Sequence, residues 1–356
     1  MVAGLASVDT VNLFLVYSPL HCLAAESIAE HQELNARNYL YYLRPGFDAL
    51  LRSQVWLEMR FLPWPRFHPL PGLLGRTKRL LNNLRVLAED CHGAASIRIH
   101  TPVIDTEAIN YAINYLRQRV PTARLTVRLI PDGLLNIQRN PLGLLQELYQ
   151  YVKKLRYLPV PGLSYYTFRG DRTGAESPIV DRIYVLPGFP HEYPSEKVVE
   201  LPPFVRCEEA AADGDASRAL VLGQPLVDFG LMSQETMQRV SSGIRQFIEQ
   251  NGIREVDYKG HPRDRNEEFR EPGYRSVTTA VPFEAYLLQH PYRLVVGISS
   301  TALVTARYIL PPESRIVAYG LEEVQFKRKC LHRNLEEMFK KLDIEMCTSV
   351  PRRSDG

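Results

Sequence analysis

Short apolar runs alternate with amphipathic stretches along most of the chain, and turn residues separate them. The run Val11–Tyr17 is rich in apolar and β-forming side chains, which predicts a buried strand. Ser18 and Pro19 end this run, and apolar residues then recur at helical spacing through Leu20–Glu30. A strand, a tight polar turn and a helix form the opening unit of a nucleotide-binding type of α/β domain.

The same alternation continues in two series, which a polar segment rich in small residues separates at 207–217. We interpret that segment as a linker between an N-terminal Rossmann-like domain, residues 1–206, and a C-terminal one, residues 218–356. The pattern therefore predicts an α/β protein whose two domains face each other across a cleft. Further strands are expected at Asn38–Leu43, Ser96–Ile99, Arg124–Ile130, Asp181–Leu186, Ala219–Leu222, Glu255–Lys259, Leu294–Gly297 and Ser314–Tyr319. Further helices are expected at Ala108–Gln118, Gln234–Gln250 with Ser233 as its N-cap, Ala285–His290, Ala302–Ile309 and Asn334–Leu342.

Composition excludes several classes of protein. The 356 residues fit two ordinary domains, and 45% hydrophobic with 23% charged residues is typical of a globular chain. A net charge of +3 is too small to indicate nucleic-acid binding. The five cysteines are scattered without CxxC spacing, which argues against a disulfide framework or a zinc site and favours a reducing compartment. No signal-peptide pattern and no apolar run of about 18 residues occurs, so we expect a cytoplasmic protein.

Two basic segments leave a peripheral membrane contact open. Arg66–Arg85 mixes arginine and lysine with leucine, and Lys153, Lys154 and Arg156 follow a second apolar stretch. Such segments form either a solvated basic helix face or a contact with anionic lipid at the inner membrane.

Candidate chemical residues follow predicted strands, at the carboxyl edge where open α/β sheets bind ligands. Asp132 comes after the strand that ends at Ile130, between Pro131 and Gly133. It is either a general base that takes a proton from an attacking hydroxyl or only a cap for the turn.

His261 follows the strand Glu255–Lys259 and precedes Pro262. We interpret it as a hydrogen-bond or proton donor to a leaving phosphate, with Lys259 nearby, or else as a surface histidine in a polar loop. Ser299, Ser300 and Thr301 open a helix after another strand. They either bind phosphate oxygens at the helix N-terminus or serve as ordinary caps.

Three weaker candidates complete the predicted site. Glu284 is either a ligand for ribose hydroxyls or a first-turn acid that favours the helix dipole. Gly223 and Gln224 form a turn where backbone could approach a ligand, or a plain βα turn. Asp213–Asp215 has the form DxD but lies in the linker, so we expect no metal there, and no other cluster has metal-ligand spacing.

Taken together, the motifs resemble the bacterial sialyltransferases, especially the lipooligosaccharide sialyltransferases and the capsular polysialyltransferases. The similarity runs in order over about residues 11–320. It rests on the opening strand with Ser18, Pro19 and His21, on Pro131-Asp132-Gly133, on Leu222-Gly223-Gln224-Pro225, on Lys259-Gly260-His261-Pro262 and on Ser299-Ser300.

This resemblance implies a GT-B fold. It also implies that the enzyme transfers a nonulosonic acid, of which sialic acid is the foremost candidate, from its CMP donor. The transfer would invert the anomeric centre and need no metal or cofactor. The acceptor would be a glycan or lipid-linked oligosaccharide of lipopolysaccharide or capsule, and homodimers are one assembly it allows. It also implies Asp132 as base and His261 as donor to the CMP phosphate. Ser299 and Ser300 would then bind the phosphate, and Glu284 would lie near the ribose.

The chain departs from the family pattern at two positions. Pro131 stands where the family has a first acidic residue, and His21 replaces the usual glutamine, which points to a change on the acceptor side or in the sugar selected. Three alternatives therefore stay open. They are transfer of another CMP-linked sugar (Kdo, legionaminate or pseudaminate), a CDP-polyol phosphotransferase, and a catalytically inactive glycan-binding protein.

Overall fold

The computed structural model describes residues 9–45, 54–132, 141–157, 159–189, 191–201, 204, 218–279, 281–326 and 329–349. The chain divides into two compact units: residues 1–187 with 191–202, and residues 188–190 with 203–356. The predicted linker 207–217 lies outside the described residues.

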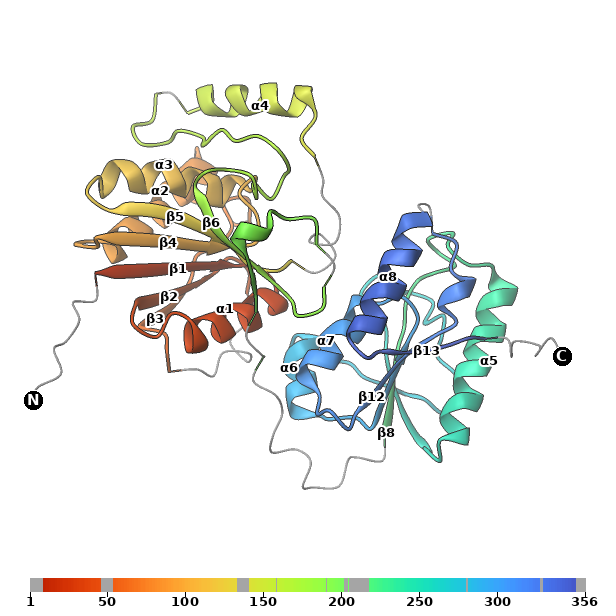
Figure 1. Cartoon of the computed structure of the whole chain (residues 1–356). Coiled ribbons are helices and arrows are strands. Elements are labelled where there is room, and N and C mark those ends of the chain that lie inside the picture. The colour runs from red at the N-terminus through yellow and green to blue at the C-terminus, as the bar shows by residue number, and fades with distance from the viewer. Residues whose placement is uncertain are drawn as a thin grey trace, which may run out of the picture. The chain divides into compact units, whose positions relative to one another are not determined.

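Unit 1 is built on a seven-stranded parallel sheet in the order β3-β2-β1-β4-β5-β6-β7 (Figure 1). The chain runs outward from β1 to β3 on one side and from β4 to β7 on the other, so the switch point lies between β1 and β4. The strands are β1 (Thr10–Val16), β2 (Arg37–Tyr42), β3 (Glu58–Phe61), β4 (Ser96–Thr101), β5 (Arg124–Leu129), β6 (Val180–Val185) and β7 (Val198–Glu200).

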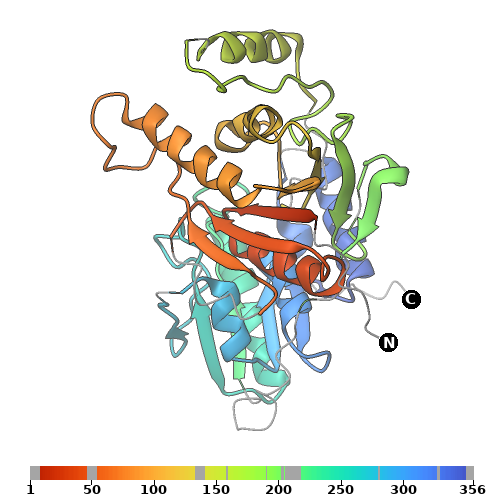
Figure 2. The same cartoon turned by 90° about the vertical axis from the view of Figure 1, so that its left-hand side faces the viewer.

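Helices cover both faces of this sheet. One face packs on α2 and α3 through a core that includes Leu13, Ile99 and Leu116, and α1 covers the other face (Figure 1). A fourth helix, α4, lies outside α3, away from the sheet, in both views (Figures 1 and 2). The helices are α1 (Pro19–His31), α2 (Gly75–Asp90), α3 (Glu107–Arg119), α4 (Leu144–Leu155) and the short 3-10 helix η3 (Ser195–Lys197).

Unit 2 repeats the plan with a six-stranded parallel sheet in the order β10-β9-β8-β11-β12-β13. Its switch point lies between β8 and β11, and α5 packs on one face through a core that includes Val240, Ile244 and Val296. The strands are β8 (Arg218–Leu222), β9 (Glu255–Lys259), β10 (Arg275–Ser276), β11 (Leu294–Gly297), β12 (Arg315–Tyr319) and β13 (Glu345–Cys347). The helices are α5 (Gln234–Gln250), α6 (Phe283–Gln289), α7 (Thr301–Ile309), the short 3-10 helix η4 (Leu321–Glu323) and α8 (Lys329–Lys341).

Two parallel sheets with helices on their faces confirm the α/β prediction of two Rossmann-like domains. Each predicted strand is present within about two residues of its expected bounds, and Ser233 caps α5 by accepting the Thr236 N–H at 3.1 Å. The pattern did not predict the edge strands β3, β7, β10 and β13 or the bounds of the helices α2 and α4.

Candidate functional site

In unit 1, the turn after β1 is fixed by a helix cap. Ser18 is the N-cap of α1, and its hydroxyl accepts the backbone N–H of His21 at 3.3 Å. Pro19 begins the helix, where its missing N–H costs nothing. This local geometry places the His21 side chain inside the fold, where it has no exposed surface.

His21 contacts Asp132, the other predicted residue of this unit. Its Nδ1 accepts the Tyr17 N–H at 3.4 Å, so the neutral ring carries its proton on Nε2. Nε2 lies 2.9 Å from Asp132 Oδ1 and donates to it, while the Tyr17 hydroxyl lies 3.5 Å from Oδ2. Burial, and then the charge of Asp132, raise the pKa of Tyr17, so this hydroxyl stays protonated. The carboxylate is therefore oriented by two donors, and its side chain remains 20% exposed.

Sheet topology explains how these residues meet. β1 and β5 both flank β4, so the loops after them leave the same edge of the sheet. The sequence had pointed to His21 and Asp132 separately. It missed both their pairing and Tyr17, because a contact between residues 111 positions apart leaves no local pattern.

In unit 2, Gln224 and Ser299 form a reciprocal pair at the switch point. The Ser299 N–H donates to Gln224 Oε1 at 2.9 Å, and Gln224 Nε2 donates to the Ser299 hydroxyl at 3.3 Å. The two residues come from the turns after β8 and β11, which are neighbouring strands. The pair joins the two turns where open α/β sheets bind ligands.

Gly223 lets the turn after β8 pass close to a buried tyrosine. A Cβ built on Gly223 would lie 2.0 Å from the Tyr258 hydroxyl, which donates to Asp264 Oδ2 at 2.6 Å. The backbone N–H of Gly223 donates to the Lys259 carbonyl at 2.9 Å. The need for glycine is therefore steric. Sequence analysis did not identify Tyr258 and Asp264 as supports of the site.

His261 follows β9 on an exposed loop that continues through Pro262. Its Nδ1 accepts the Arg263 N–H at 3.1 Å, which leaves the proton of the neutral ring on Nε2. Desolvation, and then the charge of Arg263, lower the pKa of His261 below its usual 6.5, and Lys259 adds to the effect. The ring is therefore a neutral donor at pH 7, beside two cations.

The start of α7 carries the predicted hydroxyl cluster. Ser300 is the N-cap, and its hydroxyl accepts the Ala302 N–H at 3.2 Å. Thr301 is the first helical residue, and Ser299 is held by Gln224. The capping role of Ser300 is thus real, and its hydroxyl proton remains available to donate to an anion at this helix N-terminus.

Lys259 and Glu284 influence each other's charge at the same edge. The Lys259 ammonium donates to the Gly260 carbonyl at 3.1 Å, and burial lowers the pKa of this lysine. Burial raises the pKa of Glu284, which lies in the first turn of α6, and the charge of Lys259 partly opposes that shift. A polar ligand that takes the place of the lost water would stabilise the charged form of both groups.

Because β9, β8 and β11 are consecutive in the sheet, their loops gather His261, Gly223 with Gln224, and the start of α7 at one edge. This edge offers a donor imidazole, hydroxyls and a helix N-terminus, which together suit a phosphate group. Within the described part of the chain, no group of three or more metal-ligating side chains could hold an ion. Asp213 and Asp215 lie outside that part.

Residues 186–317 match the family model described as Alpha-2,8-polysialyltransferase (POLYST). Over this stretch the chain is similar to the polysialyltransferases. The matched stretch contains the predicted residues of unit 2 from Gly223 to Thr301, whereas His21 and Asp132 lie outside it. No curated protein matches the chain significantly.

Solved structures with a similar fold are distant in sequence. The UDP-GlcNAc 2-epimerase of Methanocaldococcus jannaschii has a TM-score of 0.50 at 11% identity, over 97% of this chain and 94% of its own. UGT89C1 of Arabidopsis thaliana has a TM-score of 0.46 at 10% identity, over 95% of this chain and 84% of its own. At such identity the first of these shows the fold alone, which agrees with the expected GT-B architecture.

Within the described residues, no helix has the length and apolar content needed to cross a bilayer.

Proposed function

We propose that the chain is a polysialyltransferase-like glycosyltransferase, which transfers sialic acid from its CMP donor to a hydroxyl of a cell-surface glycan or lipid-linked oligosaccharide. One observation carries the proposal. The phosphate-suited edge of unit 2, with His261, Gln224–Ser299 and the start of α7, falls inside the stretch that matches the polysialyltransferase family. We propose that the reaction takes place in the cytoplasm and inverts the anomeric centre without a metal or cofactor.

In the proposed reaction, the bond between the anomeric carbon and the CMP phosphate oxygen breaks as the acceptor oxygen bonds to that carbon. This carbon is a ketal carbon that bears the ring oxygen and a carboxylate, so the departure of CMP gives a state with oxocarbenium character. His261 donates from Nε2 to the phosphate oxygen on which charge develops, and the start of α7 stabilises the same charge. Lys259, Gly260 and Glu284 bind the remainder of the nucleotide.

Asp132 takes the proton of the acceptor hydroxyl. Its carboxylate is oriented by His21 and Tyr17, and it keeps an exposed fraction that a substrate hydroxyl can reach. His21 is a positioning residue, because its ring is buried and both nitrogens are engaged within the protein.

The test is turnover of CMP-sialic acid with glycan acceptors, measured as the release of CMP. The same assay is run in parallel with CMP-linked Kdo, legionaminate and pseudaminate. Asp132→Ala and His261→Ala should each lower kcat by about 10²–10⁴ while the fold stays intact. Arg265→Ala, an exposed change in the same loop as His261, is the matched control. Near-normal turnover in both site variants would refute the assignment of roles. Phosphorus in the product would indicate transfer of a polyol phosphate. Binding of CMP without turnover would indicate a catalytically inactive binding protein.

A further inference from the structure

Helix α4 is amphipathic, but its polar side faces the protein and its apolar side faces outward. It lies on the far side of α3 from the sheet in both views (Figures 1 and 2). The apolar side chains of the helix recur at helical spacing, which in a soluble protein normally marks the face turned to the core. We define the α4 face by Leu144, Leu145, Leu148, Val152 and Leu155.

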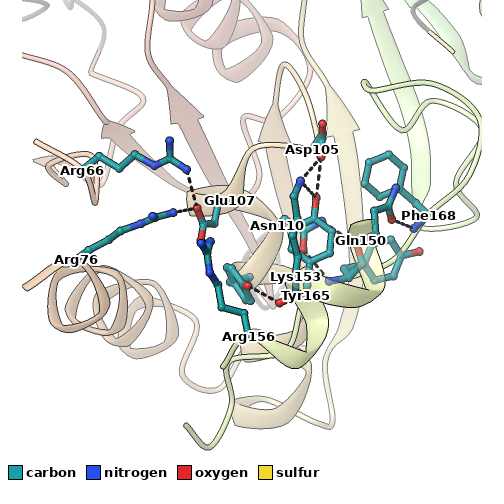
Figure 3. Close-up of polar contacts among 12 residues, drawn as sticks. Arg66, Arg76, Asp105, Glu107, Asn110, Gln150, Lys153, Arg156, Tyr165 and Phe168 are labelled. Carbon is teal, nitrogen blue, oxygen red and sulfur yellow. Dashed lines mark hydrogen bonds and ion pairs between the residues drawn. The ribbon is translucent and has the colours of Figure 1, made fainter. Parts of the chain in front are cut away.

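The polar side of α4 is fixed to unit 1 by specific bonds (Figure 3). Gln150 is buried, and its Oε1 accepts the Phe168 N–H at 2.9 Å. The Lys153 ammonium donates to Asp105 Oδ1 at 3.0 Å and lies 3.3 Å from the Tyr165 hydroxyl. These bonds set the rotation of the helix about its axis, so the outward direction of the α4 face is a defined feature of the fold.

Each side chain of the α4 face is more than half exposed, and Leu144 and Leu145 are 81% and 83% exposed. Tyr149 and Tyr151 extend the exposed apolar surface, and both are also more than half exposed. Contiguous apolar surface of this kind marks an interaction site. Tyrosine at its margin suits a boundary between apolar and aqueous surroundings.

Cationic side chains gather beside the C-terminal end of α4, where Arg156 is the C-cap. Arg66, Arg76 and Arg156 converge on one carboxylate, Glu107, with Arg66 and Arg156 each 3.3 Å from it (Figure 3). Three positive charges around one negative charge leave a local excess, and exposed Lys154 adds to it. Burial, and then the charge of Arg66, lower the pKa of Arg76, with Arg156 acting in the same sense, as expected where cations crowd together.

We propose that the α4 face seats the protein on an anionic lipid surface, with its leucines in the acyl boundary and the neighbouring arginines and Lys154 at the headgroups. A helix with one apolar face and cations beside it is the usual form of an interfacial membrane anchor. The proposal goes beyond the transfer reaction and does not depend on it, because it concerns lipid and not sugar. Of the two basic segments predicted as possible lipid contacts, the proposal keeps Lys154 and Arg156 of the second and only Arg66 and Arg76 of the first.

A second copy of the chain is a less suitable occupant. A two-fold interface would set the α4 face and its cations against the same surface of the partner. The described helix has one acidic side chain, Glu147, against Lys153 and Lys154, so like charges would meet. An anionic bilayer complements that excess.

The experiment is flotation of the full chain with vesicles of phosphatidylcholine alone or mixed with phosphatidylglycerol. The wild-type protein should bind the mixed vesicles, more weakly at high salt, and bind phosphatidylcholine less well. Leu148→Glu should lower the partition coefficient about tenfold or more, since burial of a leucine contributes about ten- to a hundredfold. Leu34→Glu is the matched control, because Leu34 and Leu148 are 65% and 62% exposed in the same unit, and it should bind like wild type.

A second pair of variants tests the contribution of positive charge to vesicle binding. Lys154→Glu should weaken binding to the anionic vesicles about tenfold and leave phosphatidylcholine binding unchanged, with Lys340→Glu as the exposed control on α8. Thermal melts should match wild type for all four variants, since the changes are at exposed positions. The proposal is overturned if wild type fails to bind anionic vesicles, or if Leu148→Glu binds like Leu34→Glu. It is also overturned if light scattering shows that Leu148→Glu dissociates a dimer that does not bind lipid.

Discussion

The substitution Gly223→Ala, which adds one methyl group, tests whether the close approach of the turn after β8 to Tyr258 requires glycine. In Gly223→Ala, the new Cβ would lie 2.0 Å from the Tyr258 hydroxyl, 2.5 Å from Tyr258 Cζ and 2.9 Å from Asp264 Oδ2. Tyr258 is 1% exposed, so its ring has no room to move without disturbing its neighbours. Neither Gly223 nor Gly260 has a positive φ, so the cost at Gly223 is a collision and not backbone strain.

Three contributions set the magnitude. Overpacking a dense core costs about 1–3 kcal/mol. Displacement of Tyr258 also removes its bond to Asp264, which is worth about 1.5–3 kcal/mol when the acceptor is charged. Alanine has fewer backbone conformations than glycine in the unfolded chain, and this stabilises the folded state by about 0.4–1 kcal/mol. We therefore expect a net loss of about 2–5 kcal/mol in the free energy of unfolding of unit 2.

Calorimetry checks this value, because about 2–5 kcal/mol should lower the Tm of unit 2 by about 5–20 °C. Both tryptophans, Trp56 and Trp64, belong to unit 1, so tryptophan fluorescence should follow unit 1 and change little. Gly260→Ala is the control, since its Cβ meets nothing closer than 3.5 Å. If Gly223→Ala melts within about 1 °C of Gly260→Ala, a difference of under about 0.5 kcal/mol, the steric reasoning is wrong.

Two further predictions concern the histidines. His21→Ala should lower kcat about 10–100-fold with little change in the KM for the donor, because Asp132 loses its orienting donor; His21→Gln, which restores an N–H, should recover part of it, and equal kcat in both variants would contradict a positioning role. The pKa of His261 is lowered in the unliganded protein, so the ring gains its proton only below about pH 6.5. A bound phosphate favours the charged ring and raises this pKa, so donor binding is coupled to proton uptake, and the KM for CMP-sialic acid should fall as pH drops from 8 to 6, by at most about tenfold per unit. His261→Gln should abolish that slope, and an unchanged slope in the variant would exclude His261 from phosphate binding.

Local pattern predicted much of the fold because strands and helices leave periodic signals in sequence. β9, β11 and α5 have the bounds expected from their apolar spacing and, for α5, from its serine cap. The short edge strands escaped prediction because they bury little. β10 is two exposed residues, and it is a strand only because β9 lies beside it.

The sequence alone determined two α/β series and the rule that their ligand residues follow strands, since both depend on neighbours along the chain. The tertiary structure alone decided which of those residues meet. Strand order joined His21 to Asp132 across 111 positions and Gln224 to Ser299 across 75. It also decided the direction of α4. The apolar spacing of that helix would place its leucines inside, yet bonds from Gln150 and Lys153 to distant loops turn them outward. Periodicity shows that a helix has two faces, but only the partners available in the folded unit decide which face is covered.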